Sequence, residues 1–320
     1  MKTLYLNRSA ATALVLGTLC AAGGAWAQGT APGGEEVAPP GQENLAATED
    51  RETPAPGEGV SFDEEANVLA AEFSIAFDSR YMTYGVIDGK DPIVTPSAKA
   101  TLFDWVYAGV EAIFDVTKTN GRRGGYGNRA GKYTTLDAIG GVAHEFDLGE
   151  TLGTLGVDFN YIYEYIPRHD GSMDDTQYLN LELSLGDLWF EPTLAIERDL
   201  MADDGTYVNA NIGHTFALAG DEEDPLLTFK PSFGQGFGDK KRTRGYELSE
   251  DHAGLMDTTV MGEFEWKICE NLALGAYVAY YDYWFDRDLR HGARDYNSAW
   301  GSGCHDSYNF VWGLSLTASF

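Results

Sequence analysis

Acidic side chains at alternate positions of apolar segments are the groups best placed to do chemistry in this chain of 320 residues. Glu263 and Glu265, for example, lie on either side of Phe264. Side chains two residues apart on a strand point to the same side, so such carboxylates would share one face. Enclosed together, they would create a negative potential that favours cations over anions. The residues assigned to this inward, pore-lining face are Glu72, Asp78, Arg80, Lys99, Glu111, Asp115, Asp137, Glu145, Asp158, Glu164, Glu182, Glu191, Glu197, Lys230, Asp257, Glu263, Glu265 and Lys267.

Histidine-based hydrolysis is the main alternative chemistry, and the spacing does not support it. A catalytic histidine on a strand would need a serine at matching spacing, and none follows His144 or His214. His169, Asp170 and His291 fall at expected loop ends, where surface histidines are common. We therefore expect no catalytic residues, no enzyme activity and no cofactor.

The balance of charge limits the partners further. A net charge of −28 disfavours nucleic acid, which needs a basic surface. The acidic stretches 170–172 and 203–205 lack the spaced ligands of a calcium loop and are expected to be turns, so no metal site is predicted. The one basic cluster, Lys240 to Arg244, lies in an expected loop. It would either contact lipopolysaccharide phosphates or simply be solvated.

The elements that would position the carboxylates alternate between apolar and polar residues with a period of two, as half-buried strands do. The end of the chain shows this best, where one face carries Tyr308, Phe310, Trp312, Leu314, Leu316, Ala318 and Phe320. The same alternation predicts about twelve antiparallel strands, near 69–78, 95–104, 106–116, 133–147, 155–165, 178–185, 188–199, 208–218, 226–237, 260–268, 271–286 and 308–320.

The connections between these strands alternate in length, which is the asymmetry of outer-membrane barrels. Short ones are expected near 104, 147–151, 186–187, 219–225 and 269–271. Longer ones, rich in Gly, Asp, Arg and Lys, are expected near 86–94, 118–132, 167–174, 200–205, 238–254 and 287–305. An even strand count places both ends of the barrel on the side of the short turns.

Aromatic residues cluster at the expected strand ends, as in the interfacial belts of membrane proteins. Those near short turns are Trp105, Trp189 and Trp266, and those near the loops are Tyr81, Tyr84, Tyr163, Tyr165, Trp284 and Phe285. Another set is expected to point inward: Tyr107, Tyr178, Trp189, Tyr207, Tyr277, Tyr281 and Tyr283. These would either stack on ring-bearing solutes or fill space, and we favour filling.

The last strand resembles the C-terminal signature of bacterial outer-membrane β-barrel proteins, with alternating apolar positions that end on Phe320. The resemblance implies that Trp312, Leu316 and Phe320 form the signal read by the barrel-assembly machinery. The segment Phe77-Asp78-Ser79-Arg80-Tyr81 and the following Tyr84-Gly85-Val86 also resemble the first strand of TorF-like porins. Tyr84 stands there where that pattern has an arginine before the glycine.

The start of the chain predicts export. Residues 1–27 look like a signal peptide, with Lys2 and Arg8 before an apolar stretch and an Ala-Trp-Ala cleavage pattern, rather than a retained anchor. Residues 28–66 are acidic and rich in proline, so we expect a disordered linker. Residues 67–320 would form the barrel. Cys269 and Cys304 are expected at opposite ends of it, which argues against a disulfide between them.

The sequence therefore predicts an all-β transmembrane up-and-down barrel in the outer membrane. The expected function is a porin-like channel for passive diffusion of small hydrophilic solutes, with a preference for cations. A packed, non-conducting lumen is the alternative, and the chain would then be a structural or adhesion barrel that displays its loops. Expected partners are outer-membrane lipids, lipopolysaccharide, the barrel-assembly machinery and small solutes or cations.

Overall fold

The computed structural model describes residues 69–117, 131, 133–149, 151–167, 175–221, 224–299, 304 and 306–320. The predicted signal peptide and acidic linker lie outside the described residues, as do the greater parts of the expected loops 118–132 and 167–174. These predictions are therefore not tested by the structure.

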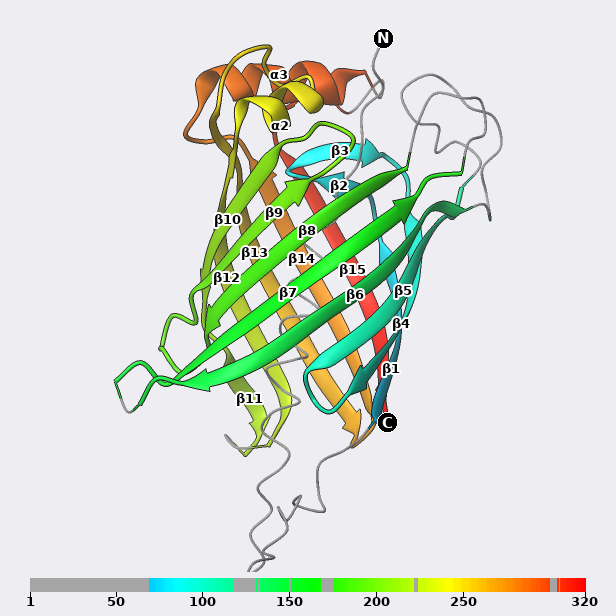
Figure 1. The fold of residues 1–320 in the computed structure, drawn as a ribbon, viewed down its shortest axis with the longest axis vertical. Coiled ribbons are helices and arrows are strands. Elements are labelled where there is room, and N and C mark those ends of the chain that lie inside the picture. The colour runs from blue at the N-terminus through cyan, green and yellow to red at the C-terminus, as the bar shows by residue number, and fades with distance from the viewer. Residues whose placement is uncertain are drawn as a thin grey trace, which may run out of the picture.

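The described chain forms a closed antiparallel barrel of 12 strands. Figure 1 shows the strands tilted around the wall, with the C-terminus at one end. The strands are β1 (Leu69–Asp78), β4 (Ile93–Leu102), β5 (Val106–Asp115), β6 (Tyr133–Asp147), β7 (Thr154–Tyr165), β8 (Thr176–Leu185), β9 (Thr193–Asp199), β10 (Thr206–Gly213), β11 (Phe216–Gly220), β12 (Pro225–Gly238), β13 (Gly254–Cys269), β14 (Leu272–Asp282) and β15 (Asn309–Ser319). Each strand pairs with its neighbours in the chain, and β10 and β11 are two pieces of one barrel strand that both pair with β12.

The ring closes between its first and last strands. The pairing of β1 with β15 runs from Glu72 opposite Ser319 to Asp78 opposite Gly313. The Phe320 amide also donates to the Ala71 carbonyl at 2.8 Å, so the end of the chain is tied to the beginning of the barrel. We call this end, with its short connections, the turn end, and the opposite end the loop end. The predicted antiparallel barrel is confirmed.

Several strand boundaries differ from the prediction, and β13 begins at Gly254 rather than near residue 260. The strand expected from residue 188 begins at Thr193, because Leu188 and Glu191 form a hydrogen-bonded turn and Pro192, which has no amide hydrogen, follows it. The strand expected to reach 286 ends at Asp282, where the chain leaves the sheet and Tyr283 turns inward to donate a hydrogen bond to the Tyr84 carbonyl.

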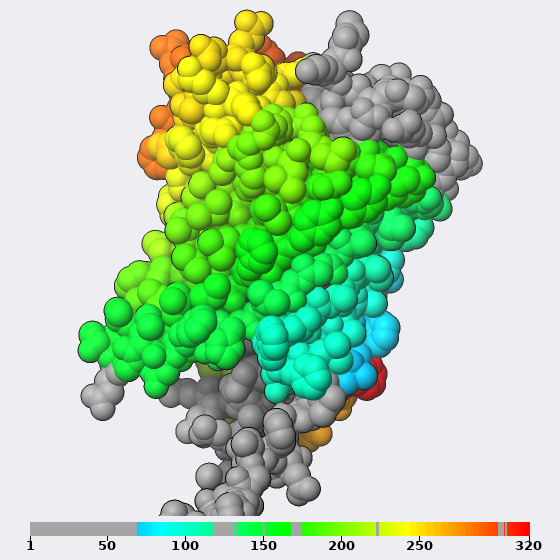
Figure 2. Space-filling model, viewed as in Figure 1, coloured from blue at the N-terminus to red at the C-terminus, as the bar shows by residue number. Residues whose placement is uncertain are grey.

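The outside of the wall is apolar and the inside polar, as the alternation predicts. In β15, Phe310 is 60% exposed, whereas Asn309 beside it is 3% exposed. Phe73, Phe159 and Phe264 lie in the same outward set on other strands. Figure 2 shows the slanted strands that form one face of the wall. Among the described residues, no helix is both long and apolar enough to cross a membrane.

The loop end contains three elements that the alternation did not predict. The strands β2 (Tyr81–Thr83) and β3 (Val86–Gly89) form a small hairpin whose members are almost all buried. The helix α2 (Lys240–Gly245) is capped by Asp239, and α3 (Arg287–Ser298) is capped by Asp286. In Figures 1 and 2 these helices, in yellow and orange, gather at the end opposite the C-terminus.

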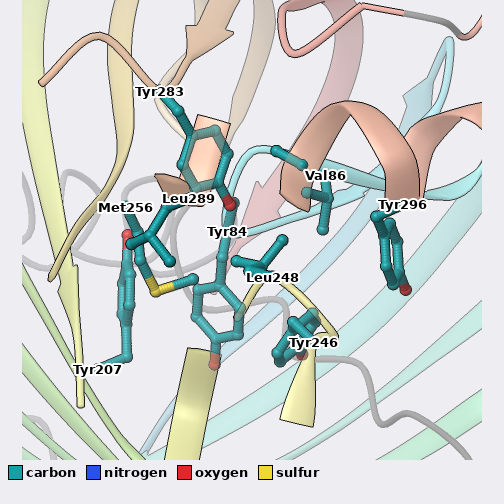
Figure 3. Packing of buried hydrophobic residues seen from close by; sticks show 10 residues of the cluster. Tyr84, Val86, Tyr207, Tyr246, Leu248, Met256, Tyr283, Leu289 and Tyr296 are labelled. Carbon is teal, nitrogen blue, oxygen red and sulfur yellow. The ribbon is translucent and has the colours of Figure 1, made fainter. Parts of the chain in front are cut away.

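Aromatic and aliphatic side chains from these elements pack into one core at the loop end. The core contains Tyr84, Val86, Tyr207, Tyr246, Leu248, Met256, Tyr283, Leu289, Ala293 and Tyr296. Figure 3 shows Tyr84 near its centre, and its ring packs against Tyr207 at 4.3 Å and Tyr246 at 4.9 Å between ring centroids. We call residues 81–89 and 240–248, together with the buried face of α3, the plug.

Glycine is required where the hairpin turns. Gly85 has a φ of +79°, which is unfavourable for other residues, and a Cβ there would lie 2.6 Å from the Asp257 Cβ. The hairpin can therefore press against β13 only with glycine at this position. Cys269 is exposed at the turn end of β13 and Cys304 is buried beside Ile87 in the plug, so both are free thiols, as predicted.

Candidate functional site

The candidate site is the inner wall of the barrel, where strand pairing sets the predicted charges side by side. Lys99 is opposite Glu72, and Lys230 is opposite Glu263. Asp158 is opposite Glu182, which brings two carboxylates together. The alternation of the strands therefore places residues far apart in the sequence on one polar surface.

The half of the wall nearer the turn end keeps access to solvent. Glu72, Asp158, Glu182, Glu263 and Glu265 are all half-buried rather than buried. Lys99 is half-buried too, and its ammonium group lies 4.2 Å from the centre of the Tyr107 ring. Glu145 is exposed near the end of β6. The charged residues of this half thus line a space that water can enter.

Two ion pairs mark the rim at the turn end. Lys230 Nζ lies 2.7 Å from a Glu191 carboxylate oxygen, and each side chain is 16% exposed. Glu191 belongs to the turn before β9 rather than to a strand, and it also accepts hydrogen bonds from Thr215. Lys267 Nζ lies 2.6 Å from an oxygen of Asp224. These contacts fix the two lysines and offset part of the local negative charge.

The half of the wall nearer the loop end is buried. Glu111, Asp137 and Glu164 are paired in register across β5, β6 and β7, and all three are at most 6% exposed. Asp115 is buried in the same region. Arg80 is half-buried and reaches the Asn309 amide oxygen at 3.5 Å. The inner wall is therefore open to water in one half and closed in the other.

Tyrosine hydroxyls donate hydrogen bonds to several of the inner carboxylates. Four such donors are Tyr107 to Asp158 at 2.6 Å, Tyr178 to Glu164 at 2.9 Å, Tyr207 to Asp257 at 2.8 Å and Tyr277 to Asp78 at 2.6 Å. A buried carboxylate needs such partners, because leaving it unpaired is costly. These tyrosines serve the packing of the lumen, which supports the expectation that they fill space. Trp189 was wrongly expected to point inward: it lies in a turn, is 71% exposed and stacks on His214.

The charged centre of the plug is Arg242, whose side chain is 1% exposed. Its guanidinium lies 3.1 Å from a Glu197 carboxylate oxygen and 3.4 Å from an Asp203 carboxylate oxygen. It also donates to the Tyr84 hydroxyl at 2.9 Å and to the Gly205 carbonyl at 3.3 Å. Tyr84 in turn donates to Glu197. One arginine thus joins α2, β9, the loop after β9 and the β2–β3 turn.

The basic cluster expected at the surface is therefore mostly neutralised. Lys240 pairs with Asp251 at 2.9 Å, and Lys241 pairs with Asp204. Arg242 is buried, so the prediction that the cluster is solvated or contacts lipid phosphates is wrong for this residue. Sequence reasoning missed Arg242 as a structural centre; the only local signal is the capping residue Asp239 before it.

The plug is expected to be more stable in acid through Asp203. Burial raises the pKa of its carboxyl to about 6 from an ordinary 3.8, although Arg242 opposes this effect. The proton is therefore held more tightly when the plug is closed. This contribution to the stability of the plug is complete below about pH 4 and is lost as pH rises through 6. Each tenfold difference in proton affinity between the closed and the open plug corresponds to about 1.4 kcal/mol.

The measurement is hydrogen exchange of α2 and the loop after β9 at pH 5 and pH 7, corrected for intrinsic exchange rates. Protection should be higher at pH 5 in the wild type, and the difference should shrink in Asp203→Asn, which cannot titrate. An equal pH effect in both proteins would show that another group is responsible.

Comparison with known proteins shows similarity in structure only. No protein-family model matches the chain, and no curated protein matches it. A KdgM porin is similar to it at 9% sequence identity and a TM-score of 0.44, over 78% of this chain and 99% of that one. The COG4313 outer membrane channel from Pseudomonas putida F1 is similar at 11% identity and a TM-score of 0.45, over 79% of this chain and 96% of that one. The resemblance to TorF-like porins stays a prediction.

The assignment of the fold rests on the barrel itself. Its ring of antiparallel strands is closed by the pairings of β1 with β15 and of β10 with β12, and large apolar side chains cover its outside. A soluble barrel would instead point its apolar side chains inward. The chain thus has the fold of a porin-like outer-membrane β-barrel.

Proposed function

We propose that this chain is a passive channel of the outer membrane for small hydrophilic solutes. The observation that carries the proposal is the half-exposed, charged inner wall at the turn end, which contrasts with the apolar outside of the same strands. Glu72, Lys99 and Asp158 are only partly buried on this wall. Their access to solvent favours a water-filled lumen.

We also propose that the channel prefers cations. Carboxylates outnumber basic groups along the predicted lining, and Lys99, Lys230 and Lys267 each lie close to a carboxylate or an aromatic ring that offsets their charge. The remaining carboxylates leave a negative potential in a narrow aqueous space, which the low-dielectric wall around it focuses. That the residues predicted to line the pore do so is part of this proposal.

The test is conductance and reversal potential of the purified protein in planar bilayers across a KCl gradient. Wild type should show discrete openings with a reversal potential of the sign expected for cation preference. The double variant Glu182→Gln/Glu263→Gln should reduce the cation-to-anion permeability ratio several-fold, because both carboxylates face the lumen. Glu250→Gln/Glu270→Gln removes two exposed carboxylates outside the predicted lining and serves as the control. An unchanged ratio in the double variant would refute the proposed selectivity.

The plug supports a second candidate function, a barrel that does not conduct. The core around Tyr84 and the Arg242 contacts close part of the loop end in the described conformation. We infer that this is the closed state of a channel, and not a permanent seal. A barrel that stays silent both as wild type and with the plug weakened would favour a structural or adhesion role for the displayed loops.

We propose the outer membrane as the location, reached through a cleaved signal peptide of residues 1–27. Outer-membrane lipids and lipopolysaccharide would surround the barrel. The barrel-assembly machinery would read the outward side chains Trp312 and Leu316 of β15 and Phe320 just after it, which are at least 41% exposed. No enzymatic role and no cofactor form part of the proposal.

A further inference from the structure

A basic pocket lies on the outside of the loop end, away from the lumen. It measures about 550 Å³ and is lined by Arg287, Arg290, His291 and Arg294 of α3, with Asp306, Ser307 and Tyr308 opposite. The three arginines and the histidine recur at intervals of three and four residues, so they share one helix face. In a chain with a net charge of −28, this face concentrates positive charge.

The opposite face of α3 anchors it to the plug. Leu289, Ala293 and Tyr296 are buried in the plug core. Gly292 packs so closely that a Cβ would overlap the Leu248 carbonyl. The direction of the basic face is therefore fixed by packing, and the side chains on it do not depend on a ligand to be held in place.

Much of the positive charge on this face is not neutralised by the protein. Arg290 is held by Asp282 at 3.0 Å and by Ser307 at 3.0 Å. Arg287, His291 and Arg294 are exposed, and they have no ion pair with any carboxylate of the described residues. The Lys240 and Lys241 side chains, which lie at the same end of the barrel, are both paired with aspartates.

The pocket opens beside the lipid-facing aromatic residues. Tyr308 lines the pocket and stacks on Tyr280 at 6.0 Å between centroids. Tyr280 also packs against Phe310 and Trp284, and both of these are exposed on the outside of the barrel. Such aromatic groups mark the level of lipid headgroups. A ligand in this pocket would therefore have anionic groups against arginine and apolar groups against the aromatic side chains below.

We propose that this pocket binds the phosphorylated headgroup of an outer-leaflet glycolipid, the lipid A portion of lipopolysaccharide. Arginine pairs bidentately with phosphate oxygens, and the adjoining aromatic surface would take the start of the acyl chains. The proposal rests on the proposed membrane location but not on conduction. It places the lipid site on α3 and not on the Lys240 to Arg244 cluster.

The test is binding of diphosphoryl lipid A to the purified full chain in a zwitterionic detergent, measured by native mass spectrometry. Arg287→Gln/Arg294→Gln should weaken binding about tenfold or more, because two charge-assisted contacts are lost. Lys240→Gln/Lys241→Gln removes the same charge from the same end and should change binding less than about twofold. Equal loss in both variants would mean that only net charge matters and would overturn the proposal.

Two further arms use the wild type and so do not depend on how the variants fold. Lipid A stripped of its phosphates should bind the wild type about tenfold or more weakly than diphosphoryl lipid A. Inorganic phosphate at equal concentration should not displace lipid A. Displacement would show that the pocket binds soluble phosphate and would overturn the proposal that its ligand is a lipid. Failure to insert into phosphatidylcholine vesicles would instead count against the membrane location itself.

Discussion

Replacing Arg242 with methionine is expected to open the plug while leaving the barrel wall folded. Methionine keeps much of the length of the side chain but removes the guanidinium from Glu197 and Asp203, whose side chains are 3% and 7% exposed. Breaking a buried ion pair by removing one partner costs about 3–5 kcal/mol, because the other charge is left uncompensated. That cost falls on the closed plug, since the carboxylates regain water when it opens.

Hydrogen exchange and conductance report on this variant independently. Protection of α2 and of the β2–β3 hairpin should fall by about two orders of magnitude or more if the loss reaches ~3 kcal/mol. Strands β4 to β8, which make no contact with Arg242 in the described structure, should keep their protection. If the channel proposal is right, the open probability in planar bilayers should rise as well.

Lys241→Met is the matched control for Arg242→Met. Lys241 is the adjacent residue of α2 and also pairs with an aspartate, but both partners are about half exposed. Exposed ion pairs contribute about 0–1 kcal/mol, so this variant should behave nearly as wild type. Adding Glu197→Gln and Asp203→Asn to Arg242→Met should restore part of the protection by removing the stranded charges. Unchanged exchange in Arg242→Met would show that the aromatic core holds the plug alone.

The wall of the barrel was predictable because the pattern of each strand is local in the sequence. In β7 and β15, apolar and polar residues alternate along most of the length, with Ile162 and Val311 the apolar exceptions on the inner face, and a slip by one residue would turn the wrong set outward. The alternation therefore predicts the strands, their faces and their antiparallel order. It failed at Trp189 and Glu191, where a turn ending at Pro192 replaces the expected strand.

The plug was not predictable in the same way, because its burial depends on residues far apart in the chain. Arg242 sits in a run of basic residues that looks like a solvated loop, yet its partners come from β9, the following loop and the Tyr84 turn. Some local signals were present. Leu289, Ala293 and Tyr296 are spaced as one face of a helix, and Asp239 and Asp286 each precede a helix as its cap. These signals indicate helices but not the place where they dock.

Arginine substitutions at two adjacent positions of β7 should separate the two faces of the wall most sharply. Phe159 points outward and is 45% exposed, near the middle of its strand. A charge there would lie in hydrocarbon, and Phe159→Arg should destabilise the barrel by about 2–4 kcal/mol. Asn160 is half-buried on the inner face and donates to Asp158 at 3.1 Å, so an arginine there would meet a carboxylate.

The free energy of unfolding in lipid vesicles, from a reversible urea titration, gives the comparison. Asn160→Arg should cost less than Phe159→Arg, about 1–2 kcal/mol, because it removes the hydrogen bond to Asp158 and the one accepted from Asn180. It should also reduce the preference for cations in planar bilayers. Because the two variants add the same charge one residue apart, net charge is matched between them. A similar loss in both would mean that Phe159 does not face hydrocarbon. The membrane location would then fail, and with it the proposed channel and the lipid site on α3.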